Sequence, residues 1–192
     1  MITAIILAAG ESKRMGEPKM LMPWGKSTVL QTVIAAIQAS GVSDVLVITG
    51  GAHKQVEALV GKSVQTIFNE DYEKGEMLSS IQVGLAEKMR EARAALICLG
   101  DQPQVQERNV RRVRDAFLKN NSSIVVPSYD LRRGHPWLVA RSLWDDLLRM
   151  KAPKTPRDFL KAHAKQIEYV IVDSPSVIDD VDTPDDYLKF KP

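Results

Sequence analysis

The sequence predicts an α/β protein built around a mostly parallel sheet. Short apolar runs alternate with amphipathic helical patterns along the chain, and the apolar runs are nearly continuous. Strand–helix alternation implies right-handed crossovers between parallel strands, and continuous apolar strands fit a sheet that is covered on both faces. The 192 residues contain no internal repeat, low-complexity tract or linker, so a single domain is the economical arrangement.

The predicted elements follow one another in a regular order. Apolar or β-branched runs predict strands at residues 2–7, 44–50, 63–69, 94–100, 122–128, 137–140 and 167–173. Apolar residues at helical spacing predict helices at residues 28–40, 53–60, 77–89, 106–119, 141–150, 157–163 and 184–188. Gly41 ends the first of these helices. The least regular stretch, residues 128–136, is predicted to be a loop.

Composition and charge argue against several classes of function. A net charge of +2 gives no global case for nucleic acid or membrane binding, so any electrostatic function must be local. No apolar run approaches the ~20 residues of a membrane span. The N-terminal run has no basic leader and is too short for a convincing signal peptide. The single cysteine, Cys98, forbids an internal disulfide framework. We therefore expect a cytoplasmic protein that binds neither nucleic acid nor membrane.

The first predicted strand leads into a segment of small residues and cations, LAAGESKRMGEPK at residues 7–19. Residues 8–10 are small enough for the backbone to approach a ligand, and their N–H groups can form an anion nest. Arg14 offers a planar donor fork and Lys19 a mobile charge, both suited to phosphate. The glycine spacing matches neither a P-loop nor a dinucleotide fingerprint. These residues alone support a phosphate cradle and a solvated turn equally well.

Two acidic residues are candidates for a metal site. Asp101 directly follows the predicted strand at residues 94–100, where ligands of a parallel sheet bind. It could hold Mg²⁺ together with phosphate oxygens, but an isolated Asp is more often a cap or turn residue. Asp182 lies in the acidic segment IDDVDTPDDY, where the sequence DTP also fits a helix cap followed by proline. Spacing does not choose between these interpretations.

Three further polar residues also allow two interpretations each. Ser80 is placed at the start of a predicted helix, where it could receive a polar ligand or cap the helix. Arg133 and His135 lie in the irregular stretch RRGHP, which could bind an anionic acceptor or form a solvated turn.

Taken together, these segments resemble the MobA-like nucleotidyltransferases, and among them the branch of molybdenum cofactor cytidylyltransferases. The family motif L-A-A-G-x-S-x-R-M-G-x-P-K, followed by a Leu-Pro-Trp-type segment, matches LAAGESKRMGEPKMLMPWG throughout. The segments NEDYEKGEMLSSIQVGL, LGDQP, RRGHP and DDVDTPDDY follow in family order, so the resemblance covers nearly the whole chain.

The resemblance implies a three-layer Rossmann-like nucleotidyltransferase fold with a mostly parallel central sheet. It implies one domain over residues 1–192, with residues 1–100 mainly the nucleotide-binding half. Residues 101–192 would then mainly bind the acceptor and complete the metal site.

Roles for individual residues also follow from the resemblance. It implies a nucleotide site made of Leu7, Ala8, Ala9, Gly10, Ser12, Arg14, Lys19 and Ser80. It implies that Arg14, Lys19 and Asp101 are catalytic, that Asp101 and Asp182 bind Mg²⁺ or alternatively Mn²⁺, and that Arg133 and His135 contact the acceptor. Lys13 falls at a variable position of the motif and is expected to be solvated.

The implied reaction is transfer of CMP from CTP to the terminal phosphate of molybdopterin, with release of pyrophosphate. Ala9 favours CTP, because the guanylyl branch usually has glycine at this position. The alternatives are a GTP-dependent guanylyltransferase of the same pathway, an NTP transferase acting on a sugar phosphate, polyol phosphate or other small phosphorylated acceptor, and a non-catalytic nucleotide- or pterin-binding carrier. A transient contact with a molybdoenzyme or its chaperone is also compatible with the resemblance.

Overall fold

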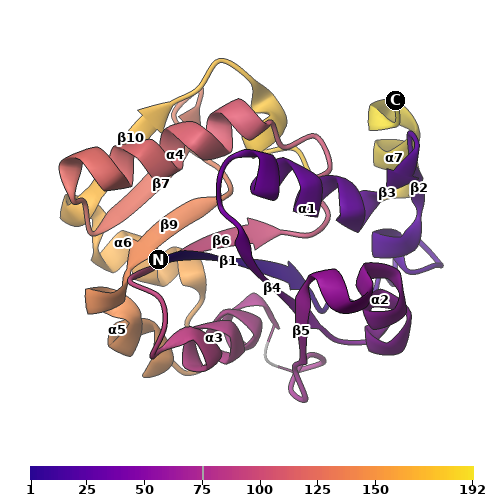
Figure 1. Cartoon of the computed structure of the whole chain (residues 1–192), viewed down its shortest axis with the longest axis horizontal. Helices are drawn as coiled ribbons and strands as arrows, with labels where there is room; N and C mark the ends of the chain where they lie inside the picture. The colour runs from indigo at the N-terminus through magenta and orange to yellow at the C-terminus, as the bar shows by residue number, and fades with distance from the viewer. Residues whose placement is uncertain (75) are drawn as a thin grey trace.

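A central sheet runs through the molecule, with helices on both sides (Figure 1). The computed structural model describes residues 1–74 and 76–192. The strands are β1 (Ile2–Ala8), β2 (Pro23–Trp24), β3 (Ser27–Thr28), β4 (Asp44–Thr49), β5 (Gln65–Phe68), β6 (Ala94–Leu99), β7 (Ile124–Tyr129), β8 (Arg132–Arg133), β9 (Trp137–Ala140) and β10 (Ile167–Ile171). The α-helices are α1 (Val29–Ala39), α2 (His53–Val60), α3 (Glu76–Lys88), α4 (Glu107–Asn120), α5 (Trp144–Leu148), α6 (Pro156–Ala162) and α7 (Pro184–Phe190). Short 3₁₀ turns are η1 (Lys19–Leu21), η2 (Gly61–Ser63), η3 (Arg141–Leu143), η4 (Ala164–Gln166) and η5 (Pro175–Val177).

The order of strands confirms the prediction of a mostly parallel sheet. Within the described part of the chain, the order is β10-β7-β9-β6-β1-β4-β5, and β8 pairs with β7. Strand β1 is parallel to both β4 and β6, β4 is parallel to β5, and β10 is parallel to β7. Strand β9 is antiparallel to both β6 and β7, so those two strands point the same way. All the long parallel strands therefore end at one edge of the sheet.

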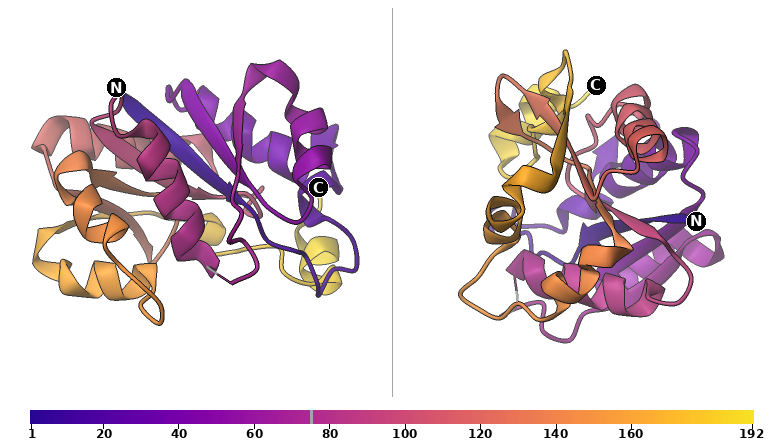
Figure 2. Two further views of the ribbon diagram at one scale, coloured as in Figure 1. Left: turned by 90° about the horizontal axis from the view of Figure 1, so that it is seen from below. Right: turned by 90° about the vertical axis from the view of Figure 1, so that its left-hand side faces the viewer.

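Alternating side chains of the strands pack into two separate cores. In β1, Ala4 and Ile6 belong to the core formed with α1, α2 and α4, whereas Ile5 and Leu7 belong to the core formed with α3, α5 and α6. The turned views in Figure 2 show these helices on opposite sides of the sheet. This arrangement is the predicted three-layer α/β fold.

Most elements form where the hydrophobic pattern predicts them, but residues 128–136 do not form a simple loop. Strand β7 continues to Tyr129, and β8 folds back to pair with it in an antiparallel hairpin. The turn is made by Asp130 and Leu131, whose φ angles are 46° and 62°. A two-residue strand is too short to carry a periodic signal, so only the tertiary pairing reveals it. The predicted helix at residues 141–150 is also divided, into η3 and α5.

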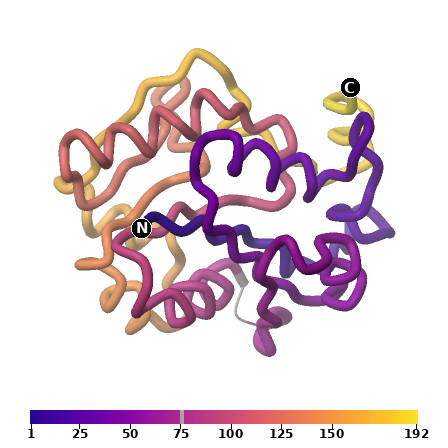
Figure 3. The backbone as a smooth tube through the Cα atoms, in the orientation of Figure 1, coloured from indigo at the N-terminus to yellow at the C-terminus, as the bar shows by residue number. Residues whose placement is uncertain are grey.

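A third, small core joins the C-terminal segment to residues 22–29. It contains Met22, Trp24 and Val29 from the region of β2 and β3, and Val181 and Tyr187 from the C-terminal segment. Figure 3 shows the C-terminal end of the tube beside this early part of the chain. No α-helix within the described residues is long and apolar enough to cross a membrane.

Candidate active site

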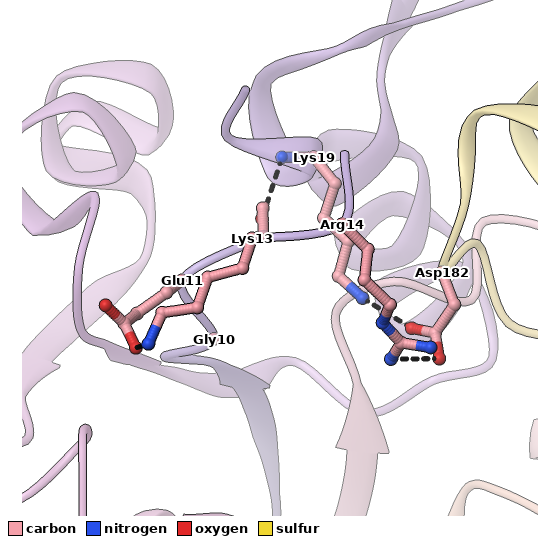
Figure 4. Close-up of a pocket in the computed structure, with 7 residues that line it drawn as sticks. Gly10, Glu11, Lys13, Arg14, Lys19 and Asp182 are labelled. Atoms are coloured by element: carbon pink, nitrogen blue, oxygen red, sulfur yellow. Dashed lines mark hydrogen bonds and ion pairs between the residues drawn. The ribbon is translucent and has the colours of Figure 1, made fainter. Parts of the chain in front are cut away.

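A cation-rich loop follows β1 at the carboxyl edge of the sheet. Ser12 and Gly16 adopt left-handed φ angles of 55° and 75°, which turn the loop back on itself. The Ser12 hydroxyl closes the loop by accepting a hydrogen bond of 3.1 Å from the backbone N–H of Lys19. The loop forms most of a pocket of about 270 Å³, which is lined by Gly10, Glu11, Ser12, Lys13, Arg14, Lys19 and Asp182 (Figure 4).

Lys19 lies between two carboxylates that come from distant parts of the chain. Its Nζ donates to Asp101 Oδ2 at 2.5 Å and to Asp182 Oδ1 at 3.0 Å. The side chains of Lys19, Asp101 and Asp182 are 10%, 17% and 29% exposed. The structure thus brings together three of the residues that the sequence singled out.

The other cations of the loop point in two directions. The Arg14 guanidinium donates to Asp182 Oδ2 at 2.7 Å, so Asp182 is bound by both Arg14 and Lys19. Lys13 turns away from these groups and pairs with Glu11 at 2.8 Å (Figure 4). The Lys13 side chain is 78% exposed, which confirms that it is solvated.

Backbone contacts fix the two carboxylates at this edge. The N–H of Gly100 donates to the Leu7 carbonyl, so the residues after β6 stay beside β1. The N–H of Val181 donates to the Asp101 carbonyl at 2.9 Å, which brings the C-terminal segment to the same point.

Neither carboxylate is used as a helix cap. The N-cap of α7 is Thr183, which forms a capping box with Asp186. The N-cap of α4 is Gln106. Asp101 and Asp182 are therefore free to face Lys19, and the capping interpretation of either residue is wrong.

The ion pairs shift the proton affinities of the groups in the site. Burial acts to lower the pKa of Lys19, but the Asp101 and Asp182 carboxylates outweigh it and raise that pKa above its usual value. Partial burial acts to raise the pKa of Asp182, but Lys19 and Arg14 outweigh it and lower that pKa. Near neutral pH, Lys19 and Asp182 are therefore both charged.

Asp180 is a neighbour of the site that the sequence did not single out. Desolvation, and then the charges of Asp182 and Asp101, raise the pKa of Asp180. The Asp180 side chain therefore interacts electrostatically with both carboxylates. The acidic segment around Asp182 was the only sequence signal for it.

The residues expected to read the nucleotide lie near the carboxyl ends of β1 and β5, on either side of β4. Leu7, Ala8 and Ala9 are buried at the end of β1, whereas Gly10 faces the pocket. Beyond β5, buried Asn69 donates through Nδ2 to Ser79 Oγ at 2.8 Å and to Ser80 Oγ at 3.0 Å.

The position of Ser80 in α3 corrects the interpretation of this residue as a helix cap. Ser79 and Ser80 lie inside the first turns of α3, which begins at Glu76, so neither of them caps the helix. Asn69, which holds both hydroxyls, was missed by the sequence analysis, although it is the last residue of the strand predicted at residues 63–69.

The two expected acceptor residues lie outside the pocket of the cation loop. Arg133 is exposed on β8, where its Nε donates to the Tyr169 hydroxyl at 2.9 Å and its guanidinium lies over the Tyr169 ring. His135 precedes β9 at the carboxyl edge, and its backbone N–H donates to the Val177 carbonyl. Burial, with a smaller effect of Arg157, lowers the pKa of His135 to about 4, so the ring is neutral at neutral pH.

The chemistry of Asp101 and Asp182 fits a magnesium or manganese ion. Both present carboxylate oxygens to one point, the Lys19 Nζ, beside a pocket lined by cations. Mg²⁺ is usually held by one or two carboxylates, with phosphate oxygens and water as its other ligands. Among residues 1–74 and 76–192, no three His, Cys, Asp or Glu side chains group closely enough to hold a metal ion. A metal at this point would therefore need ligands from a bound phosphate or from water.

Comparison with known proteins identifies the class and the family of the chain, which is a nucleotidyltransferase. The family model described as the MobA-like NTP transferase domain matches residues 4–167. The chain therefore belongs to the MobA-like NTP transferase family.

Several individual proteins are similar to the chain over nearly its whole length. The molybdenum cofactor cytidylyltransferase of Escherichia coli K12 is 29% identical over 194 residues, which cover 99% of this chain and 95% of that protein. The crystal structure of Rv0371c from Mycobacterium tuberculosis H37Rv has a TM-score of 0.87 at 32% identity, covering 98% of this chain and 95% of that one. A structure of Rv0371c in complex with manganese has a TM-score of 0.82 at 30% identity, covering 99% and 97% of the two chains.

Proposed function

We propose that this protein transfers CMP from CTP to the terminal phosphate of molybdopterin and releases pyrophosphate. The observation that carries the proposal is the convergence of Lys19, Arg14 and two carboxylates beside the pocket of the cation loop. Similarity to the E. coli cytidylyltransferase supports the choice of base and acceptor. In this reaction an acceptor phosphate oxygen bonds to the α-phosphorus, and the bond from that phosphorus to the β-phosphate bridging oxygen breaks. The electron pair leaves with pyrophosphate.

The residues of the chain position and neutralise charge rather than move protons. A phosphate monoester is already an anionic nucleophile near neutral pH, so the attack needs no side-chain base. Arg14 and Lys19 would bind triphosphate oxygens and offset the repulsion between the two anions. Asp101 and Asp182 would hold Mg²⁺ or Mn²⁺, which supplies further neutralisation of phosphate charge when it is bound.

The remaining sequence assignments extend this proposal along the sheet edge. Residues 1–100 would form most of the nucleotide half, with Leu7 to Gly10 and Ser80 against the nucleoside and Ser12 shaping the phosphate loop. Residues 101–192 would provide the metal carboxylates and the acceptor region around Arg133 and His135. The contribution of the cation loop to the pocket supports the first half of this division.

Replacement of Asp101 by Asn tests the site directly. The variant keeps the shape of the side chain but removes one charge from the proposed metal position. We expect pyrophosphate release from CTP and acceptor to fall by about 100-fold or more, the effect of losing one preorganised electrostatic contact. Asp185→Asn is the matched control, because Asp185 is exposed in the first turn of α7 and outside the pocket. Turnover of Asp101→Asn equal to that of the control would refute the role of Asp101.

Thermal unfolding with nucleotides and Mg²⁺ separates the proposed reaction from its alternatives. A nucleotide that binds the folded protein raises Tm, and the rise grows with affinity. We expect a larger rise with CTP than with GTP. A larger rise with GTP would favour a guanylyltransferase, and binding of CTP without pyrophosphate release in the presence of acceptor would favour a carrier. Pyrophosphate release with sugar or polyol phosphates in place of molybdopterin would reassign the acceptor.

A further inference from the structure

One ammonium group occupies the point at which the two proposed metal ligands meet. Lys19 Nζ is 2.5 Å from Asp101 Oδ2 and 3.0 Å from Asp182 Oδ1, and Lys19 as a whole is 8% exposed. The two carboxylates come from separate segments and would repel each other without a cation between them. In this structure, Lys19 supplies that cation.

A divalent ion bound by the same oxygens would compete with Lys19. Mg²⁺ lies about 2.0–2.1 Å from its oxygen ligands. An ion bridging Asp101 and Asp182 would therefore lie within a few ångströms of the position of Nζ, where like charges repel strongly. Lys19 must leave at least one carboxylate before both can hold the metal.

The pocket offers Lys19 another anionic partner. Lys19 and Asp182 both line the pocket of the cation loop, together with Arg14. A triphosphate bound there would present oxygens to both cations, and Lys and Arg are suited to such contacts. Exchange of a carboxylate partner for a phosphate partner would leave Lys19 paired throughout.

We propose that Lys19 is a built-in counter-ion that occupies the metal position until a metal–nucleotide complex arrives. This inference rests on the proposed function for the metal carboxylates and the triphosphate pocket. It predicts that metal alone binds weakly, because Lys19 must be displaced without a new partner. Metal and nucleotide then bind together, because the phosphates receive the displaced ammonium group.

The proposal gives Lys19 opposite effects on two binding steps. Lys19 opposes the binding of metal alone, and it favours the binding of the metal–nucleotide complex. A lysine that only contacted phosphate would affect the second step alone. A lysine that only held the fold together would change stability without this reversal of sign.

Titration with Mn²⁺, followed by the electron paramagnetic resonance signal of the free ion, measures the first step without any turnover. Lys19→Met is expected to bind Mn²⁺ about tenfold or more tightly than the wild type, since one neighbouring charge changes ion affinity by that order. Lys26→Met removes the same charge from an exposed position outside the pocket of the cation loop. This control is expected to match the wild type.

The same titration with saturating CTP measures the second step, where Lys19→Met is expected to bind the Mn²⁺–CTP complex more weakly than the wild type. Equal affinity of wild type and Lys19→Met for Mn²⁺ alone would overturn the inference and leave the metal site standing. Failure of both proteins to bind Mn²⁺, with and without CTP, would overturn the inference and the proposed metal site together. Circular dichroism checks folding, and Lys19→Gln carries the same expectations if the Met variant unfolds. Lys19→Arg keeps the charge and is expected to keep metal-alone binding weak.

Discussion

The close approach of Gly50 to the backbone of Ala9 can be used to test how the ends of β1 and β4 pack at the proposed nucleotide site. Gly50 follows β4 directly, beside the end of β1, since Ala8 pairs with Thr49. A Cβ atom at Gly50 would lie 2.2 Å from the Ala9 carbonyl oxygen and 2.8 Å from Ala9 Cα. Both contacts are with backbone atoms, so no flexible side chain can rotate away. Gly50→Ala must therefore push the two strand ends apart.

The size of the effect follows from this overlap. The two segments must separate by about 1 Å before the contact reaches an ordinary distance. Overpacking of this kind costs about 1–3 kcal/mol, which for a chain of this length lowers Tm by about 2–12 °C. Under the proposed function, residues 8–10 lie against the nucleoside. A displacement of about 1 Å can then reduce the rate of transfer by about 100-fold.

The neighbouring glycine provides a matched control. A Cβ at Gly51 would meet Glu11 Cγ and Tyr72 Cε2 at 3.5 Å, which is ordinary van der Waals contact. Gly51→Ala should be neutral or slightly stabilising, because it also restricts the unfolded chain. Circular dichroism gives the two Tm values, and pyrophosphate release gives the two rates of transfer. The reasoning is refuted if Gly50→Ala has the Tm and the rate of transfer of Gly51→Ala.

Two further predictions concern polar groups near the same edge. Asn69→Ala removes a buried donor that is shared by Ser79 and Ser80. It should lower the free energy of unfolding in urea by about 1–3 kcal/mol and weaken CTP binding. Unchanged values for both quantities would contradict the role assigned to Asn69. His135 has a pKa of about 4 when folded, against 6.5 for the ordinary group. The unfolded chain therefore takes up this proton first, and stability falls by at most about 3 kcal/mol as pH drops from about 6.5 towards 4. His135→Gln should flatten that part of the pH dependence of urea unfolding, and an unchanged slope would refute the assignment.

The sequence predicted most of the elements because their signals are local. The helix predicted at residues 53–60 coincides with α2, and the predicted strand at residues 137–140 coincides with β9. Both carry their hydrophobic pattern within one segment. The β2–β3 hairpin escaped prediction, since strands of two residues have no period to detect. It depends instead on contacts with α7, from the far end of the chain.

The residues of the candidate site could be named from the sequence, but the ion pairs between them could not. Position after a strand placed Asp101 at the sheet edge, and family motifs added Arg14, Lys19 and Asp182. No local pattern could show that the Lys19 ammonium lies between two carboxylates, because its partners are 82 and 163 residues away. Pairing of Arg133 with Tyr169 likewise follows from the approach of β8 and β10 to β7.

A small apolar core holds the segments that carry the ion pairs of the site. This core decides whether Lys19 can exchange its carboxylate partners for a phosphate. Val181, next to Asp182, is fully buried, and its N–H is bonded to the Asp101 carbonyl. Tyr187 of α7 packs against Trp24, and its hydroxyl donates to the Pro23 carbonyl. Burial of each large apolar side chain contributes about 1.5–3 kcal/mol, whereas the exposed Arg14–Asp182 pair contributes about 0–1 kcal/mol. The positions of the cation loop and Asp182 are therefore fixed mainly by packing. Lys19 can leave its carboxylates for a phosphate without releasing the segment that carries Asp182.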